Sequence, residues 1–320
     1  MQRMVKVIQG AITTLAVVSC VFAGGAKEMT YGEEYETTAA GKTGINWVKA
    51  KEIRPGISYV RRELDEPRLM KVFLIRVDLQ APGLKFTGTG RDPQWGEQMP
   101  DVTNRVCLIR TRRQRTRDFM LGQRRSVAEG GKGRDLVVAV NTEPWGPWEE
   151  PFTHKYANPS SPLISDGEVV SASSTGGRAV FVVYTNGVAD ITSNITSNQT
   201  PQIWCAHTGF NIIMRDGEDI AKPGGSLAPR TAFGLSKDRR WLYLLAVDGR
   251  QPDYSLGADM HDLVTLLKDA GAWDAMNMDG GGSTTLVYWD DATGKPVVCN
   301  QQTTSGYTRP VGANMGIYFE

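Results

Sequence analysis

A strand, a helix and a second strand follow one another within residues 241–279, and this order constrains the fold more than any other part of the chain. Residues 241–247 are an apolar run of strand length, and residues 274–279 are also predicted to form a strand. Between them, residues 258–270 have the helical period, and Gly271 is suited to end a helix. The apolar residues that share one stripe of this helix are Met260, Leu263, Val264 and Leu267. Such a connection usually joins parallel strands in a right-handed crossover.

Charged residues follow both strands of this unit. Asp248 and Asp279 come at the C-terminal ends, which lie at one edge of the sheet when the two strands are parallel. A hairpin with its turn at residues 236–240 brings Arg230 to the same end, and Arg250 follows Asp248 closely. Two carboxylates and two arginines suit an anionic substrate that needs an acid, a base or a nucleophile. The alternative is a lattice of Asp–Arg ion pairs that only stabilises the edge.

The segment that ends the second strand, residues 275–285, reads Ala-Met-Asn-Met-Asp-Gly-Gly-Gly-Ser-Thr-Thr. In an extended strand, Asn277 and Asp279 point to the same face. The glycines accept backbone angles that other residues resist, and successive N–H groups in such a turn suit an anion-binding nest. The candidate ligand groups of the segment are Asn277, Asp279, Gly280, Gly281, Gly282, Ser283 and Thr284. The alternative is a glycine-rich hairpin turn without a ligand.

The rest of the chain indicates many short strands. It contains 35 glycines and 16 prolines, and the Asx-Gly pairs at residues 166–167, 186–187 and 216–217 are typical of tight turns. We therefore predict an α+β fold, with a strand-rich mixed sheet core and a few helices, including the strand–helix–strand crossover in the C-terminal third. With 320 residues, 40% of them hydrophobic, the chain can bury a sizeable core. Its net charge of +1 creates no overall field that selects nucleic acid or a membrane, so no nucleic-acid partner is expected.

The first 23 residues are predicted to direct export. Arg3 and Lys6 precede an apolar run, residues 11–23, that is too short for a comfortable membrane span. Cleavage after Ala23 would release the protein. A bacterial lipobox ending at Cys20 would instead leave that cysteine lipidated, and we favour this second interpretation slightly. We expect contact with a membrane only through such an anchor.

The remaining chain is predicted to form a tether, residues 24–45, and a single domain, residues 46–320. The tether is rich in glycine, glutamate and threonine, and the whole protein is expected to be secreted or held in the cell envelope. Cys107, Cys205 and Cys299 are far apart and have no metal-type spacing. We therefore predict neither a metal site nor a cofactor.

A loop rich in proline and tryptophan follows a short buried strand at residues 137–140. The prolines and glycine of residues 142–148 indicate a shaped loop. The candidate binding residues here are Asn141, Glu143, Trp145 and Trp148. The two tryptophans suit stacking on the apolar face of a sugar, because aromatic rings line many ligand pockets. The alternative is that both rings anchor the loop in the core.

Residues 105–125 contain eight arginines, with Asp118 as the only acid in that window. An anionic partner, such as phosphate or a polymer, is one interpretation of this segment. The other, which we favour, is a solvated helix face with Leu108, Phe119 and Leu121 packing inward.

Four motifs in the last third have the order and spacing of a known family. They are Ala-Pro-Arg-Thr-Ala-Phe-Gly at 228–234, Val-Asp-Gly-Arg at 247–250, Ser-Leu-Gly at 255–257 and Met-Asn-Met-Asp-Gly-Gly-Gly-Ser-Thr at 276–284. With these motifs, residues 228–319 resemble the phosphodiester glycosidase family. One departure begins at Asn141, where the family usually has Asn-Gly-Gly-Phe-Phe and this chain has Asn-Thr-Glu-Pro-Trp. This wall of the pocket should differ from that of the family, so no sugar specificity is transferred.

The resemblance implies hydrolysis of a sugar-1-phosphodiester, with the glycosidic C1–O bond broken and a phosphomonoester released. Phosphate is a good leaving group, so charge neutralisation would supply much of the catalysis. The groups that would provide it are Arg230, Arg250, Arg309 and the glycine turn at 280–282. Asp279 and Asp248 are candidates for the nucleophile or for the base that activates water, and their separation would decide between retention and inversion.

Two other functions stay open at the level of sequence. A phosphodiesterase that breaks a P–O bond in an anionic polymer would use the arginines of residues 105–125, although it would normally need a cluster of metal ligands. A non-catalytic envelope protein that binds glycans would use Trp145 and Trp148. The expected partner in the favoured interpretation is a carbohydrate or glycan phosphodiester.

Overall fold

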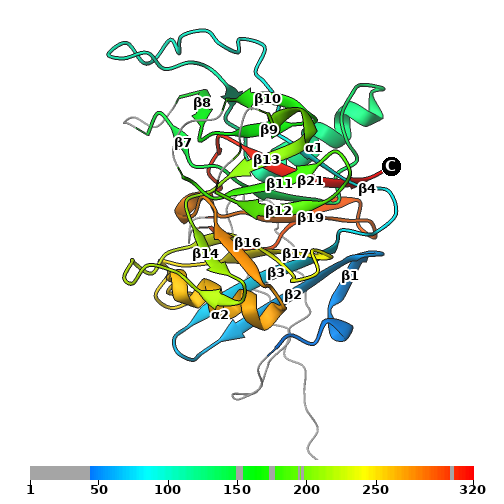
Figure 1. Ribbon diagram of the computed structural model, residues 1–320, viewed down its shortest axis with the longest axis vertical. Coiled ribbons are helices and arrows are strands. Elements are labelled where there is room, and N and C mark those ends of the chain that lie inside the picture. Colours follow the sequence, from blue (N-terminus) through cyan, green and yellow to red (C-terminus); the bar gives the residue numbers. More distant parts are fainter. Residues whose placement is uncertain (1–43, 149–153, 173–176, 194, 196–197, 303–305) are drawn as a thin grey trace, which may run out of the picture.

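The computed structural model describes residues 44–148, 154–172, 177–193, 195, 198–302 and 306–320 (Figure 1). The predicted export signal lies outside the described residues, as does the predicted tether except for its last two residues. The described residues form two α-helices, three short 3-10 helices and 21 strands in four sheets, which confirms the predicted strand-rich α+β class.

The largest sheet has eight strands in the order β1-β2-β3-β17-β16-β18-β14-β15. Their bounds are Lys51–Arg54 for β1, Ile57–Leu64 for β2, Met70–Asp78 for β3, Trp241–Val247 for β17, Arg230–Leu235 for β16, Asp274–Asn277 for β18, Ile212–Arg215 for β14 and Glu218–Asp219 for β15. Each neighbouring pair is antiparallel. The register places Arg230 opposite Val247, so the start of β16 lies beside the end of β17.

The predicted crossover is present, with helix α2 (Met260–Ala270) between β17 and β18. These two strands run parallel, but β16 is inserted between them and is antiparallel to both. The sequence predicted a mixed sheet, but each pair of adjacent described strands in this sheet is antiparallel. Helix α2 starts with a capping box formed by Asp259 and Asp262 and ends at Gly271 with φ 107°. The C-terminal ends of β17 and β18 consequently lie at the same edge.

Three smaller sheets complete the structure. One has the order β10-β9-β13-β11-β12, the second β20-β19-β6-β21-β4 and the third β5-β8-β7. The bounds are Leu84–Gly88 for β4, Thr111–Arg112 for β5, Val138–Asn141 for β6, Trp145–Gly146 for β7, Tyr156–Pro159 for β8, Leu163–Ser165 for β9, Glu168–Ser171 for β10, Val180–Tyr184 for β11, Ala189–Thr192 for β12, Ile203–Thr208 for β13, Leu286–Asp290 for β19, Lys295–Val298 for β20 and Asn314–Phe319 for β21. The predicted Asx-Gly turns join β9 to β10, β11 to β12 and β14 to β15, with positive φ at each glycine.

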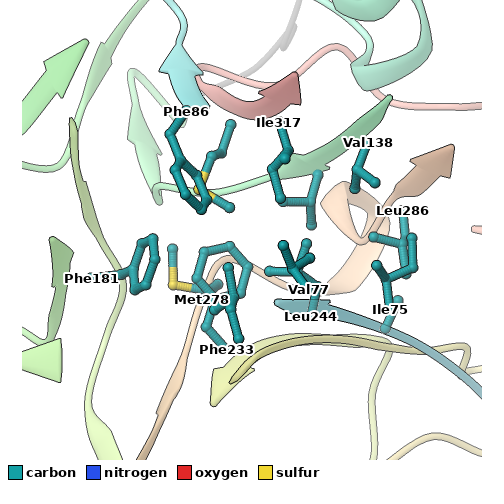
Figure 2. Close-up of a cluster of buried hydrophobic side chains, with 14 of the residues drawn as sticks. Ile75, Val77, Phe86, Val138, Phe181, Phe233, Leu244, Met278, Leu286 and Ile317 are labelled. Atoms are coloured by element: carbon teal, nitrogen blue, oxygen red, sulfur yellow. The ribbon is translucent and has the colours of Figure 1, made fainter. Parts of the chain in front are cut away.

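The main hydrophobic core lies where the eight-stranded sheet meets the two five-stranded sheets. Figure 1 shows the eight-stranded sheet with α2 in the lower half and the five-stranded sheets in the upper half. In Figure 2, Phe86 and Ile317 approach from one five-stranded sheet, Phe181 from the other, and Phe233 and Leu244 from the large sheet. The Phe181 ring meets the Phe233 ring edge-on at a centroid distance of 5.6 Å. This packing holds the eight-stranded sheet in place, together with the edge of that sheet on which the charged residues lie.

The arginine-rich segment is partly helical, as the favoured interpretation predicted. Helix α1 (Thr116–Ala128) packs Phe119 and Met120 against Leu136 and Tyr318. Several of the arginines pair with protein groups: Arg117 with Asp118 at 3.0 Å, and Arg124 with Asp135 at 2.7 Å. Leu108 and Leu121 are only partly buried. None of the described helices is long and apolar enough to cross a membrane.

Candidate active site

A cavity of about 390 Å³ opens at the edge where β16 begins and β18 ends. Its lining combines one carboxyl group, three arginines, two tryptophans and the glycine turn. The lining residues are Pro144, Trp145, Trp148, Phe210, Ala228, Arg230, Arg250, Asp279, Gly280, Gly281, Gly282, Ser283 and Arg309. Most of the side chains predicted from the last third of the sequence therefore meet at one place.

Asp279 supplies the carboxyl group of this lining. It follows β18, and its backbone N–H donates to the carbonyl of Thr142 at 2.9 Å. Burial raises the pKa of this carboxyl to about 6, against the opposing effects of the Ser283 hydroxyl and the Arg309 charge, and the nearby Glu143 raises it further. A carboxyl group with a pKa near neutrality, facing a cavity, suits a nucleophile or a general base.

The three glycines each lie against one arginine. A Cβ on Gly282 would come within 2.7 Å of the Arg309 guanidinium carbon, and one on Gly281 within 3.4 Å of Arg250 Nη1. A Cβ on Gly280 would lie 2.8 Å from the Pro229 carbonyl and 3.7 Å from the Arg230 side chain. The absence of side chains at residues 280–282 therefore makes room for the arginines. This is a physical reason for three consecutive glycines at this position.

The backbone of the glycine turn is largely occupied by the protein itself. The N–H of Gly281 donates to the Pro229 carbonyl at 2.8 Å, and the N–H groups of Ser283 and Thr284 donate within the turn. Among the three glycines, only Gly281 therefore uses its N–H in one of these backbone hydrogen bonds. The contribution of the glycine N–H groups to anion binding stays a prediction, and the close packing of the arginines gives the glycines a second role as spacers.

None of the three arginines has a carboxylate within 4.0 Å in the part of the chain that the structure describes. Arg230 donates to the carbonyls of Ala258 at 3.1 Å and Ser226 at 2.7 Å, which are neutral acceptors. Burial lowers the pKa of Arg230 and that of Arg309, and the positive charge of Arg250 lowers both further. The charge of Arg250 therefore repels those of Arg230 and Arg309. A bound anion would relieve this repulsion.

Arg250 has an unusual backbone conformation. Its φ of 60° lies in the left-handed region, which non-glycine residues rarely adopt. The preceding Gly249 packs so tightly that a Cβ there would lie 2.6 Å from the backbone nitrogen of Pro229. The backbone of segment 247–250 therefore lies directly against the backbone of segment 228–230, because Gly249 has no side chain to separate them. Strain of this kind is often retained where it aims a functional side chain.

Trp145 and Trp148 form one wall of the cavity. Their rings meet edge-to-face, with centroids 5.2 Å apart. The Arg309 guanidinium lies 4.8 Å from the Trp148 ring, whose residue is 54% exposed. Trp145 is held by β7 and packs on Gly312. Trp148 is therefore the more accessible of the two for contact with a sugar. Trp145 also anchors the loop, as the alternative interpretation of the sequence predicted.

Three lining residues were not predicted. Phe210, Pro144 and Ala228 contribute apolar surface. Phe210 reaches the cavity because its N–H donates to the carbonyl of Asn277 at 2.8 Å. No sequence signal marks this contact, since the two residues are far apart in the chain. Pro144 lies between the predicted residues Glu143 and Trp145, and Ala228 begins the family-like motif at 228–234.

Asn141 is buried next to the cavity, and its side-chain amide makes hydrogen bonds within the protein. Its amide nitrogen donates to the Asp279 carbonyl at 2.7 Å, and its amide oxygen accepts from the Thr231 hydroxyl at 2.8 Å and the Thr285 N–H at 2.9 Å. The residue does not line the cavity. The structure therefore places it as a brace that joins β6, β16 and the segment carrying Asp279, rather than in contact with a ligand.

Replacing Asn141 with alanine is expected to lower the free energy of unfolding by about 2–4 kcal/mol, because buried partners would lose their hydrogen bonds. Chemical denaturation measures this change. The exposed Asn186, whose side chain accepts from the Val188 N–H at 3.0 Å, provides the control, and its alanine variant should lose about 1 kcal/mol or less. Equal losses in the two variants would contradict the assigned role of Asn141.

Asp248, predicted together with Asp279, does not line the cavity. It is fully buried and accepts from Asn300 Nδ2 at 3.0 Å and from the Gln301 N–H at 2.8 Å. Burial raises its pKa to about 7 against these hydrogen bonds. Asn300 also donates to the Thr284 carbonyl at 3.0 Å. Asp248 therefore supports the far side of the glycine segment, and the structure does not bring the two aspartates together at the cavity.

Three further predicted binding residues lie behind the cavity wall. Glu143 is buried and accepts from the Thr208 N–H at 3.0 Å, with His207 Nδ1 at 3.1 Å. Asn277 and Thr284 are also buried and absent from the lining. Because the three residues are buried and do not line the cavity, a direct contact with a ligand is not supported for them.

No group of three or more His, Cys, Asp or Glu residues in the described ranges could hold a metal ion. What the cavity offers is a single carboxyl group beside several arginines and an aromatic wall. This combination can bind an anion next to a sugar and place one carboxylate at the bond between them.

Comparison with known proteins places this geometry in context. The model of the phosphodiester glycosidase family matches residues 134–318, more than half of the chain. Among solved structures, the catalytic domain of zebrafish N-acetylglucosamine-1-phosphodiester alpha-N-acetylglucosaminidase, auto-inhibited by its pro-peptide, has a TM-score of 0.57 at 17% identity, covering 87% of each chain. A hypothetical protein from Synechocystis has a TM-score of 0.53 at 11% identity over 83% of this chain and 62% of that one. At these identities the two structures show a shared fold only. No curated protein matches the chain.

Proposed function

The chain belongs to the phosphodiester glycosidase family, and on that premise we propose that it hydrolyses the glycosidic bond of a sugar-1-phosphodiester in the cavity beside Asp279. The observation that carries this proposal is the convergence of Arg230, Arg250 and Arg309, without carboxylate partners within 4.0 Å among the described residues, on one carboxyl group of raised pKa. Export to the envelope or the exterior stays a prediction from residues 1–23.

In the proposed complex, the phosphodiester lies among the arginines and the sugar lies towards the tryptophan wall. Asp279 then either attacks C1, forming a glycosyl ester that water afterwards hydrolyses at C1 to release the sugar, or removes a proton from the water that attacks C1 directly. The C1–O bond breaks, and its electron pair goes to the bridging oxygen of the phosphate. Because the second pKa of a phosphomonoester is about 6, this leaving group departs without a general acid. A single cavity carboxylate therefore suffices for the reaction.

The arrangement differs from that of glycosidases that use two carboxyl groups across the bond. Asp248 is enclosed by Asn300 and Gln301, and Glu143 is enclosed by His207 and Thr208. The reaction needs no second group in contact with the substrate, since arginine charge replaces the proton that an alcohol leaving group would require. The charge of Glu143 instead contributes to the raised pKa of Asp279.

The proposal is tested by incubating the purified protein with methyl diesters of several sugar-1-phosphates and identifying the products. Free sugar and methyl phosphate would support the proposed glycosidase. Sugar-1-phosphate and methanol would instead indicate cleavage of a P–O bond, which was the alternative phosphodiesterase. Binding of the diesters without turnover by folded protein would favour the non-catalytic alternative, in which Trp145 and Trp148 bind the glycan.

The rate is expected to rise with pH through about 6, because the reaction uses the ionised carboxylate of Asp279 and its pKa is raised to about 6. Below that pH, kcat/KM should fall about tenfold per unit, since one proton inactivates the enzyme. The diester itself stays ionised throughout, so it adds no inflection. Measurement of kcat/KM between about pH 4.5 and 8, with folding followed by circular dichroism, checks this profile. A profile that is flat or falls with rising pH would exclude an ionised Asp279 from the reaction.

A further inference from the structure

A buried carboxylate lies directly behind the wall of the cavity. Glu143 is 1% exposed and follows Thr142, whose carbonyl accepts from the Asp279 N–H at 2.9 Å. The phosphodiester glycosidase family usually has glycine at this position, so this chain has a negative charge where the family usually has no side chain. Because burying a charged group is costly, such a group beside a cavity is a candidate for a role in the chemistry of the site.

The partners of Glu143 favour its ionised form. Its Oε1 accepts from the Thr208 N–H at 3.0 Å and lies 3.1 Å from His207 Nδ1. Its Oε2 accepts from the hydroxyl of Thr142. An ionised carboxylate only accepts hydrogen bonds, so it matches a surrounding of groups that can donate.

His207 does not cancel the charge of Glu143. Its ring is fully buried, and Nε2 has no hydrogen-bond partner among the described residues. Gly88 packs on the ring, since a Cβ there would lie 2.9 Å from His207 Cε1 and 3.3 Å from Nε2. A proton on Nε2 would leave a buried N–H unsatisfied, which is costly. The neutral imidazole with its proton on Nδ1 avoids this cost and donates to Glu143, so the pair keeps one negative charge.

Glu143 and the arginines of the cavity act on Asp279 in opposite directions. Burial and the Glu143 charge raise the pKa of the Asp279 carboxyl, whereas the Ser283 hydroxyl and the Arg309 charge lower it. A carboxylate that binds its proton more firmly is also a stronger base. The other charged groups around the two carboxylates are Arg230 and Arg250 in the cavity, and Asp166, whose charge acts with that of Glu143 on the buried Cys205 thiol.

We propose that Glu143 is a positioning residue of the site: its buried negative charge, which His207 leaves uncancelled, strengthens Asp279 as base or nucleophile. Glu143 acts through Asp279 and does not line the cavity. Glutamate in place of the glycine usual in the family therefore sets the pH range in which this enzyme works. This inference rests on the proposed glycosidase function and adds a residue to it.

The variant Glu143→Gln removes the charge and keeps the shape of the side chain. Its acid limb of kcat/KM, measured on a sugar-1-phosphodiester that the wild type hydrolyses, should move to lower pH by roughly half a unit or more, because a like charge beside Asp279 is lost. Relative to the plateau, kcat/KM at about pH 5 should then be roughly threefold higher than in the wild type. A lower plateau with the acid limb unmoved would mean that Glu143 only supports the fold, and would overturn the inference.

Three further variants separate charge from shape. Glu143→Asp keeps the charge, so its acid limb should lie closer to that of the wild type than the limb of Glu143→Gln does. Glu143→Gly removes the charge by a second route and should move the limb in the same direction as Glu143→Gln. Glu52→Gln, exposed on β1 and outside the cavity lining, is the matched control and should keep the wild-type limb. Equal shifts in Glu143→Asp and Glu143→Gln would overturn the inference.

A titration without substrate distinguishes this inference from the proposed function. The carboxyl carbon of Asp279 is followed by carbon-13 NMR, and its resonance is identified by its absence from Asp279→Asn. The midpoint should lie at about 6 in the wild type and lower in Glu143→Gln. A lower midpoint, with no free sugar released from any diester by the wild type, would remove the proposed function and keep the charge effect of Glu143. An unchanged midpoint would overturn the inference, with or without turnover.

Discussion

The variant Asp279→Asn is expected to lose catalysis while keeping its fold. Asparagine has nearly the shape of aspartate but can act neither as a nucleophile nor as a base, so kcat should fall about 10²- to 10⁴-fold on any sugar phosphodiester that the wild type hydrolyses. The substrate should still bind, because the three arginines remain in the cavity. Steady-state kinetics give kcat, and calorimetry gives the affinity.

Stability provides an internal check on this result. The folded-state pKa of Asp279 lies above the usual value for aspartate, so its ionisation opposes folding as the pH rises from about 4 through 6. At pH 7 the melting temperature of Asp279→Asn should therefore equal or exceed that of the wild type. Asp65→Asn, on an exposed turn, serves as the matched control and should keep full activity. A fully active Asp279→Asn enzyme would exclude the assigned role.

The variant Arg309→Gln is expected to have the second largest effect. Arg309 lies beside the Asp279 carboxyl and against Gly282, where negative charge develops on the leaving phosphate. Loss of one such stabilising group typically reduces the rate about 10²- to 10³-fold, so kcat/KM should fall by that amount. Because the barrier is affected more than the ground state, most of the loss should be in kcat.

Lysine at the same position separates charge from geometry. Arg309→Lys keeps the positive charge but loses the planar two-point donor, so it should recover only part of the activity lost in Arg309→Gln. Arg54→Gln, outside the cavity, should behave as the wild type. An Arg309→Gln enzyme with unchanged kcat/KM would show that the leaving group does not lie where the structure indicates.

Much of the site was predictable because short motifs determine the local backbone. The period of residues 258–270 predicted α2, and the strand-like segments on either side predicted β17 and β18. A crossover of this kind puts both strand ends at one edge, and Asp279 and the arginines at 230 and 250 do meet there. What the sequence could not provide was the insertion of β16 between the two strands, because pairing with non-neighbouring segments leaves no periodic signal.

The direction of each side chain at the edge was not predictable either. Asp248 and Asp279 occupy equivalent places after their strands, yet Asp248 is enclosed by Asn300 and Gln301, while Asp279 faces the cavity. The residues that enclose Asp248 come from a segment about 50 positions later, so the sequence around Asp248 contains no sign of them. The same reason explains why Phe210 was missed.

The glycine turn shows how one motif is compatible with two physical roles. Three consecutive glycines are compatible both with an anion nest and with close approach of other atoms. The N–H groups of Gly281, Ser283 and Thr284 are used inside the protein, and the arginines packed near the turn show the close approach. Only the three-dimensional contacts distinguish the two, because both need the same residue type.

The position of the broken bond tests the central claim most directly. Hydrolysis of a sugar-1-phosphodiester is carried out in water enriched in oxygen-18, and both products are analysed by mass spectrometry. Attack at C1, with Asp279 as nucleophile or base, predicts the label in the free sugar and none in the phosphomonoester. Label in the phosphate, with none in the sugar, would mean that water attacks phosphorus, and would contradict the glycosidase function proposed for this cavity.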